Sequence, residues 1–271
     1  MIFNIKFSII ITSKFLLYFY ICLDKQKQII MIINKVTIVG IKGFKGSGKD
    51  TVASMISYIL YDGIMKANYN TWLLYHKNGF VENDEIIIHF ADKLKDDISE
   101  FCGIDRKLLD KQEIKENYYY NFKTGIVSTN IKDADYVIND TLEFDNLSTL
   151  FLLNTNVSIK IRTLLQYYGT NVIRNHFWHK AFINYTMNKA FDIRNSKGQC
   201  IIADARFEND ECEAIKQCGG MIIRVDRKFN NNDNHESEQI KISQDDYVID
   251  NTGTLVGLFY KVLKFVTDYM V

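Results

Sequence analysis

A glycine-rich loop that ends in a lysine constrains the fold of this chain more than any other feature. Residues 43–51 read GFKGSGKDT, close to the phosphate-binding pattern G-x-x-x-x-G-K-[ST]. The preceding run VTIVGI is apolar at nearly every residue, as a central parallel strand is, and Val52, Met55, Ile56 and Ile59 share one helix face. Because strand, loop and helix follow in this order, we expect a phosphate-binding loop rather than a glycine-rich turn that binds nothing.

The residue types in the loop suit a phosphate chain. Gly43, Gly46 and Gly48 let the backbone approach phosphate closely and turn its N–H groups inward, next to the positive end of the following helix. Lys49 adds an ammonium group for the β and γ phosphates.

Asp50 stands where the pattern has the hydroxyl that ligates a metal ion, and Thr51 follows one place later. Nucleoside monophosphate kinases often have G-K-x-T, which Thr51 fits. Asp50 either holds the metal through water or caps the start of the helix. The sequence leaves these alternatives open.

Composition points to a small partner. The 271 residues carry 33 Lys plus Arg and 33 Asp plus Glu, so no overall field favours nucleic acid or an anionic membrane, and we expect neither as a partner. Five scattered cysteines without a C-x-x-C pair indicate a reducing compartment, and we expect the cytoplasm, or the host cytoplasm for a viral protein. A homodimer is compatible with the sequence.

Residues 1–30 differ from the rest of the chain. The run FSIIITSKFLLYFYIC is apolar, but Lys14 interrupts it and it is short for a membrane span; no small-residue cleavage site for a signal peptide follows. We expect an extension over 1–30, disordered or absent from the mature protein, and one domain over 31–271.

Five apolar runs, separated by several helical patterns, predict an α/β fold. The runs end near Ile41, Phe90, Asp204, Val225 and Asp250. This alternation predicts a three-layer α/β/α P-loop fold with a mainly parallel sheet of about five strands and ligands at the strands' carboxyl ends. The remaining segments are predicted as two helices over 159–191 that meet at a bend near Gly169, a helix over 255–269, and an inserted flap or lid over 105–156.

The segment CIIADARFEND places three charged residues after one predicted strand. Asp204 resembles the carboxylate that faces Mg²⁺ at such a position, although an Asp there is more often a helix cap or loop residue. Ala205 follows where hydrolytic ATPases usually have glutamate, which favours transfer to a bound acceptor. Arg206 could neutralise charge on the transferred phosphoryl group, and Asp210 could orient an arginine or the nucleotide. Either residue could equally form a surface ion pair of no consequence.

The segment IRTLLQYYGTNVIRNHFW has the groups that a nucleoside monophosphate needs. Arg162 and Gln166 share a helix face, and Arg174 and Trp178 follow. Arginines bind phosphate and an indole stacks on a base. The alternative places the aromatic residues in the core and the arginines in solvent, and spacing alone does not decide.

Seven segments in order resemble the phage-type deoxynucleoside monophosphate kinases: GFKGSGKDT, FADKLKDDI, RTLLQYYGTNVIR with FW, IIADARFENDECEAI, GGMIIRVDR, HESE and VIDNTGTLVGLF. The resemblance covers almost everything from Met31 onward and implies a P-loop kinase with ATP and Mg²⁺ as donor and a deoxynucleoside monophosphate (dNMP) as acceptor. Lys93 replaces the family's usual proline, which puts the shape of that turn in doubt.

The resemblance also implies roles for single residues. For ATP these are Gly43, Lys45, Gly46, Ser47, Gly48, Lys49, Asp50 and Thr51. For the acceptor they are Leu94, Lys95, Arg162, Gln166, Gly169, Thr170, Arg174, Trp178 and Asp210. Catalytic roles fall to Lys49, Asp204 and Arg206, and metal binding to Asp50, Thr51 and Asp204.

Two alternatives remain beside a dNMP kinase. A phosphomevalonate kinase-like enzyme has a similar G-K-D loop. A nucleotide-binding protein without catalysis is less compatible with Lys49, Asp204 and Arg206 occurring together. A DNA-dependent ATPase is disfavoured because the net charge is zero and no glutamate follows Asp204.

Overall fold

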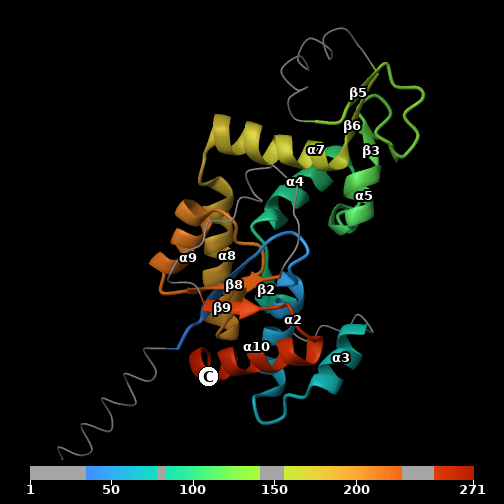
Figure 1. Ribbon diagram of the computed structural model, residues 1–271. Coiled ribbons are helices and arrows are strands. Elements are labelled where there is room, and N and C mark those ends of the chain that lie inside the picture. The colour runs from blue at the N-terminus through green and yellow to red at the C-terminus, as the bar shows by residue number, and fades with distance from the viewer. Residues whose placement is uncertain (1–34, 78–83, 141–155, 228–246) are drawn as a thin grey trace, which may run out of the picture.

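A computed structural model describes residues 35–77, 84–140, 156–227 and 247–271. The expected extension over 1–30 and the HESE segment lie outside the described residues. The larger sheet has five parallel strands in the order β2-β7-β1-β8-β9. They are β1 (Ile38–Lys42), β2 (Ile87–Ile88), β7 (Cys200–Ile202), β8 (Met221–Asp226) and β9 (Tyr247–Asp250). Figure 1 labels the strands β2, β8 and β9, which lie above the helix α10 (Leu255–Tyr269) in that view.

Strand β1 is the central strand, and all five of its residues are buried. Val39 pairs with Ile201 of β7 on one side and with Met221 of β8 on the other. An apolar strand of this kind is stable only with helices on both faces. The loop that follows β1 therefore opens at the carboxyl edge of the sheet.

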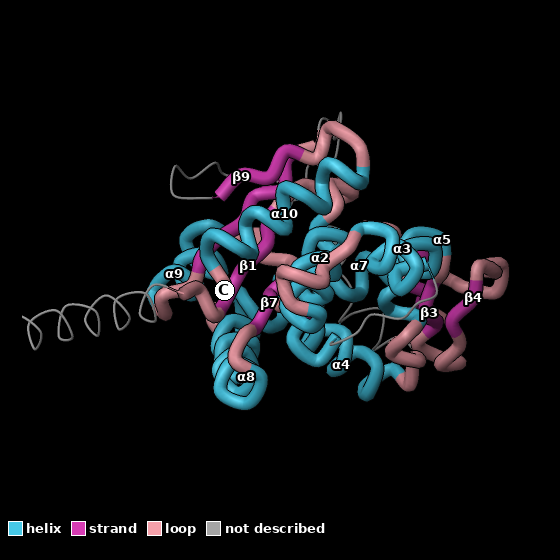
Figure 2. Tube along the Cα trace, turned by 90° about the horizontal axis from the view of Figure 1, so that it is seen from below, coloured by secondary structure: helices cyan, strands magenta, loops and turns pink. Residues whose placement is uncertain are grey.

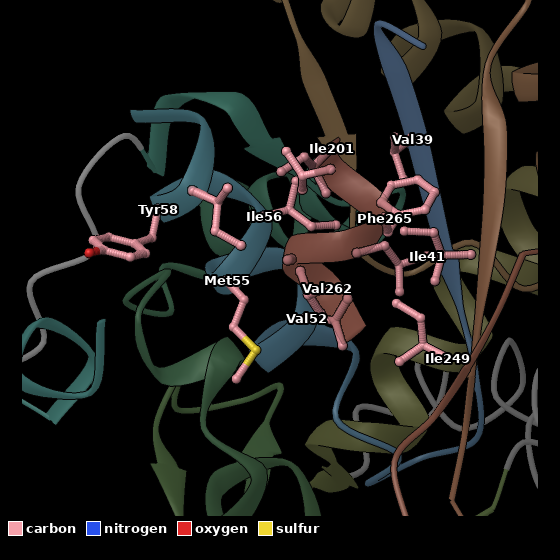
Figure 3. Close-up of a cluster of buried hydrophobic side chains, with 14 of the residues drawn as sticks. Val39, Ile41, Val52, Met55, Ile56, Tyr58, Ile201, Ile249, Val262 and Phe265 are labelled. Atoms are coloured by element: carbon pink, nitrogen blue, oxygen red, sulfur yellow. The ribbon is translucent and has the colours of Figure 1, made fainter. Parts of the chain in front are cut away.

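One face of the sheet is covered by α2 (Lys49–Asp62) and α10 (Leu255–Tyr269), with α3 (Tyr69–Lys77) packed beside them. Figure 3 shows the resulting core, in which Val52 and Ile56 of α2 lie near Phe265 of α10 and Ile41 of β1. The helix α10 begins where Thr254 Oγ1 accepts a hydrogen bond from the Gly257 N–H.

The opposite face is covered by α8 (Ala181–Lys197) and α9 (Glu213–Gln217), which pack against Ile38, Ile202 and Ile222. A five-stranded parallel sheet between two helix layers confirms the predicted three-layer α/β/α fold.

A second, smaller sheet occupies much of the segment predicted as an insertion. Its order is β4-β3-β6-β5, and Figure 2 shows β3 and β4 beyond α5 and α7, away from β9. Its strands are β3 (Tyr119–Asn121), β4 (Val127–Ser128), β5 (Tyr136–Ile138) and β6 (Val157–Lys160). The sheet packs against α4 (Ala91–Cys102), η2 (Leu108–Asp110), α5 (Gln112–Asn117) and α7 (Ile161–Gln166) around a core of its own.

The helical region after residue 159 differs from its prediction. The helix α7 continues without a bend through Gly169 as a π-helix, η4 (Tyr167–Phe177), and the chain turns instead at Trp178–Lys180, before α8. Gly169 allows η4 to approach α4 closely, because a Cβ added at this position would lie 3.3 Å from the Leu94 side chain. A short 3-10 helix, η1 (Asp84–Ile86), precedes the short strand β2.

Candidate active site

The loop after β1 is built around a lysine and an asparagine that bind its own carbonyls. Lys49 Nζ donates to the Gly43 and Phe44 carbonyls at 2.6 and 3.0 Å. Asn251, directly after β9, donates from Nδ2 to the Ser47 carbonyl at 2.7 Å. Gly48 has φ 98°, and a Cβ there would lie 2.6 Å from Asn251 Nδ2. The hydrogen bond between Asn251 and the Ser47 carbonyl therefore requires glycine at position 48.

Two observations test whether the loop suits a polyphosphate. The Ser47 hydroxyl is fully buried, and among the described residues it has no hydrogen-bond partner. A Cβ at Gly43 would lie 2.5 Å from that hydroxyl, so only glycine keeps the inside of the loop open. A glycine-bounded cradle that contains an unpaired polar group fits a phosphate chain.

The loop opens into a cavity of about 570 Å³ that lies between the two sheets. Thirteen predicted site residues line it, from four separate parts of the chain: Lys45, Gly46, Lys49, Asp50, Leu94, Lys95, Arg162, Gln166, Gly169, Thr170, Arg174, Asp204 and Arg206. The tertiary structure thus brings the loop, α4, α7, η4 and the end of β7 to one site.

Other predicted site residues lie elsewhere. Gly43, Ser47, Gly48 and Thr51 belong to the loop and the start of α2 but are not in the cavity lining. Trp178 ends η4 and is half exposed, outside the lining.

Asp210 also lies outside the lining and accepts a hydrogen bond from His179 Nε2 at 2.8 Å. The carboxylate that pairs with an arginine belongs instead to the next residue, Glu211, which contacts Arg174.

Asp204 binds the backbone of the neighbouring strand-helix junction. Its carboxylate accepts hydrogen bonds from the Phe90 and Ala91 N–H groups at 2.6 and 3.2 Å, and it is 8% exposed. This arrangement caps the start of α4, one of the interpretations that the sequence left open. It also fixes the carboxylate in the cavity wall beside the loop.

His89 was not predicted, and it lies between carboxylates from two helices. Its ring nitrogens are 3.6 Å from Asp50 Oδ1 and 3.6 Å from Asp92 Oδ2. Burial by itself would lower the pKa of His89, but Asp50, Asp92 and Asp204 outweigh it and raise the pKa to about 10. The imidazolium in turn lowers the pKa of Asp50.

Glu116 of α5 was also missed, and it joins the loop to α7. Its carboxylate accepts hydrogen bonds from Lys45 Nζ at 3.0 Å and from Arg162 Nε at 2.7 Å. Burial would raise the pKa of Glu116, but Arg162 and Lys45 outweigh it and lower the pKa to about 2.

Glu211 is the carboxylate that holds Arg174. The Arg174 guanidinium is 2.7 Å from Glu211 Oε1 and lies 3.9 Å from the centre of the Phe207 ring. Glu211 Oε2 accepts a hydrogen bond from the Arg206 N–H at 2.8 Å, so one buried side chain positions both arginine-bearing segments. Burial raises its pKa to about 7, although Arg174 opposes that shift.

The cavity is cationic although the whole chain is neutral. Seven lysine or arginine side chains line it against four carboxylates. A concave site with this excess attracts phosphates. His89 directly precedes the quoted segment FADKLKDDI, and Glu211 lies within the quoted segment IIADARFENDECEAI, so both stood close to residues already singled out. Lys115 and Glu116 lie in the poorly patterned segment, where no motif points to them.

A phosphate-binding loop that opens into a cationic cavity defines a P-loop phosphotransferase. The family described as deoxynucleotide monophosphate kinase matches residues 37–262. The chain therefore belongs to the deoxynucleotide monophosphate kinase family, and as a kinase of this family it uses ATP.

Two curated relatives carry that name, both viral. The chain is 26% identical over 237 residues to a protein of Acanthamoeba polyphaga mimivirus, covering 85% of this chain and 96% of the relative. It is 26% identical over 240 residues to the deoxynucleotide monophosphate kinase of Enterobacteria phage T4, covering 83% and 96%. These matches favour neither a phosphomevalonate kinase nor a non-catalytic protein.

None of the helices in the described ranges combines the length and the apolar character that crossing a bilayer requires.

Proposed function

We propose that the chain transfers the γ-phosphoryl group of ATP, bound with Mg²⁺, to a dNMP and so forms a dNDP for DNA precursor synthesis. One observation carries the proposal: Lys49 of the phosphate-binding loop lines the same cavity as Arg162 and Arg174. A donor phosphate chain and an acceptor phosphate can therefore meet in one cavity, which transfer requires.

The loop residues fit the donor. The backbone between Gly43 and Thr51 would hold the β and γ phosphates, and Lys49 would leave the Gly43 and Phe44 carbonyls to bind them. Asp50, Thr51 and Asp204 are the proposed metal ligands, directly or through water. When bound, Mg²⁺ would neutralise negative charge on the phosphate chain.

The acceptor would lie against α4, α7 and η4. Arg162, Arg174 and Lys95 supply charge for its phosphate; Gln166 and Thr170 supply hydrogen bonds; and the Gly169–Leu94 contact shapes the wall. Arg206 would stabilise the transferred phosphoryl group. No strong base is needed because the acceptor phosphate is already a nucleophile.

Trp178 and Asp210 remain proposed acceptor residues although neither lines the cavity. A homodimer and a cytoplasmic location are further proposals. So is the division into an extension over 1–30 and a kinase domain over 31–271 with its insertion near 105–156. Sedimentation of the purified chain would test the dimer.

The direct test measures ATP consumption with a panel of deoxy- and ribonucleoside monophosphates, and with phosphomevalonate as a rival acceptor. We expect turnover with at least one dNMP. Nucleotide binding without transfer to any dNMP, or turnover with phosphomevalonate alone, would contradict the proposal.

The panel is repeated with Lys49→Ala and Arg174→Ala. Lys49→Ala should lower kcat at least 100-fold, because the ammonium stabilises charge in the transition state. Arg174→Ala should mainly raise KM for the acceptor. Lys66→Ala, an exposed lysine in the turn after α2, is the control; near-normal turnover by the Lys49 variant would refute the assignment.

A further inference from the structure

Lys115 is a cavity residue to which the motifs assign no role. It lies on α5, in the segment where the sequence shows little pattern, and its side chain is partly buried. It lines the cavity together with Lys95, Arg162 and Arg206.

The neighbouring cations have carboxylate partners. Arg162 Nη2 lies 2.6 Å from Glu116 Oε1, and Lys95 Nζ lies 2.8 Å from Asp110 Oδ1. Arg174 is paired with Glu211 at 2.7 Å. For Lys115, no carboxylate oxygen of the described residues lies within 4.0 Å of the ammonium group.

An ammonium group in this position is unfavourable without an anion. Burial is the largest cause that lowers the pKa of Lys115, and repulsion from Lys95, Arg162 and Arg206 adds to it. The pKa falls to about 8, although Asp110 opposes the shift. Glu116 is adjacent in sequence, but its carboxylate binds Lys45 and Arg162. A bound dianionic phosphate would remove the deficit of negative charge.

We propose that Lys115 is a binding residue for the phosphate of the acceptor nucleotide. The inference rests on the proposed function and adds a residue to it. The acceptor is favoured over the donor because Lys115 shares the cavity wall with Lys95 and Arg162, which the proposed function assigns to the acceptor phosphate, and their positive charge acts on it. The ammonium donates hydrogen bonds to phosphate oxygens and takes no part in bond making.

The test is a calorimetric titration of the full chain with the best dNMP from the panel and with the corresponding deoxynucleoside, which lacks the phosphate. Lys115→Met should weaken dNMP binding about 10- to 100-fold, the range for one charge-assisted hydrogen bond, and leave deoxynucleoside binding unchanged. Lys115→Arg should restore most of the dNMP affinity. Lys111→Met changes an exposed lysine at the start of the same helix and should behave as wild type.

Proton uptake gives a second readout. At pH 8.5 part of Lys115 is neutral in the free protein, and phosphate binding should recharge it, so wild type takes up protons on binding dNMP and Lys115→Met takes up fewer. Titrations in two buffers with different ionisation enthalpies measure this uptake. The groups facing Lys115 are Lys95 of α4, Asp110 of η2, Arg162 of α7 and Arg206, and both proteins retain them.

Unchanged dNMP affinity in Lys115→Met would overturn the inference, and so would an equal loss of affinity for the deoxynucleoside, since that marks a structural role. If wild type phosphorylates dNMP while Lys115→Met binds it equally well, this inference fails alone. If wild type neither binds nor phosphorylates any dNMP, the proposed function fails and the inference with it.

Discussion

Two carboxylates, the partly exposed Glu116 and the buried Glu211, organise cations of this site. Glu116 holds Lys45 and Arg162, and Glu211 holds Arg174 and the backbone N–H of Arg206. Each carboxylate joins groups from separate parts of the chain and fixes their orientation before a ligand binds. Such preorganisation lowers the cost of ordering long side chains when phosphate arrives.

Glu211 also makes a prediction about stability and pH. The pKa of Glu211 rises from 4.5 to about 7 on folding. Between these two pH values, Glu211 is protonated in the folded chain and ionised in the unfolded chain. The stabilisation is therefore full below pH 4.5 and is lost as the pH rises through 7. Relative to Glu211→Gln, wild type should lose about 1 to 3 kcal/mol of unfolding free energy between pH 4.5 and 7.5.

Urea unfolding at several pH values measures that difference. Glu213→Gln, an exposed glutamate two positions away, should follow wild type. Parallel curves for wild type and Glu211→Gln would contradict the assignment of this pH dependence to Glu211.

At the scale of elements, the site is made where strands end and helices begin. The phosphate-binding loop lies between β1 and α2, Asp204 follows β7 and caps α4, and Asn251 follows β9. Parallel strands place these junctions at one edge of the sheet. The π-helix η4 contributes Gly169, Thr170 and Arg174, in agreement with the frequent occurrence of π segments at functional sites.

Asn251→Ala should loosen the loop because the Ser47 carbonyl loses its side-chain donor. We expect KM for ATP to rise about 3- to 10-fold, the effect of one ordinary hydrogen bond, with KM for the acceptor nearly unchanged. Steady-state kinetics with each substrate varied in turn measure both constants. Asn184→Ala, exposed on α8, is the control; an increase confined to the acceptor KM would show that Asn251 does not act through the loop.

At the scale of the whole molecule, the described residues form two sheets with separate cores and a cavity between them. The larger sheet supplies the loop, and the smaller one carries α5 and α7, with Glu116, Lys115 and Arg162. The segment predicted as a flap or lid is thus in large part an ordered wall of the site in the described residues.

Phe259 connects three helices in the larger core. It is fully buried, and its ring lies 6.3 Å from Tyr58 of α2 and 6.0 and 6.2 Å from Tyr69 and Trp72 of α3. Phe259→Ala should lower the unfolding free energy by about 3 to 5 kcal/mol through lost burial and the cavity left behind. Denaturant unfolding measures the loss, which Tyr260→Ala, 60% exposed, should not show; a similar small effect in both variants would contradict this account.

The sequence by itself determined the local parts of the protein. GFKGSGKDT between a β-branched run and a helical face predicted the loop, and alternating apolar runs predicted the parallel sheet, because backbone conformation and burial leave short-range patterns. Thirteen of the predicted site residues line one cavity. Their motifs could be placed from the sequence because they follow predicted strands or lie on predicted helices.

Only the tertiary structure decided which charged groups meet. Glu116 reaches Lys45 across 71 residues, and Glu211 rather than Asp210 reaches Arg174 across 37. It also placed the turn between helices at Trp178–Lys180 instead of near Gly169, and it built the second sheet from a poorly patterned segment. Pairing between distant side chains depends on how whole layers pack, and a single sequence without that packing leaves no periodic signal of it.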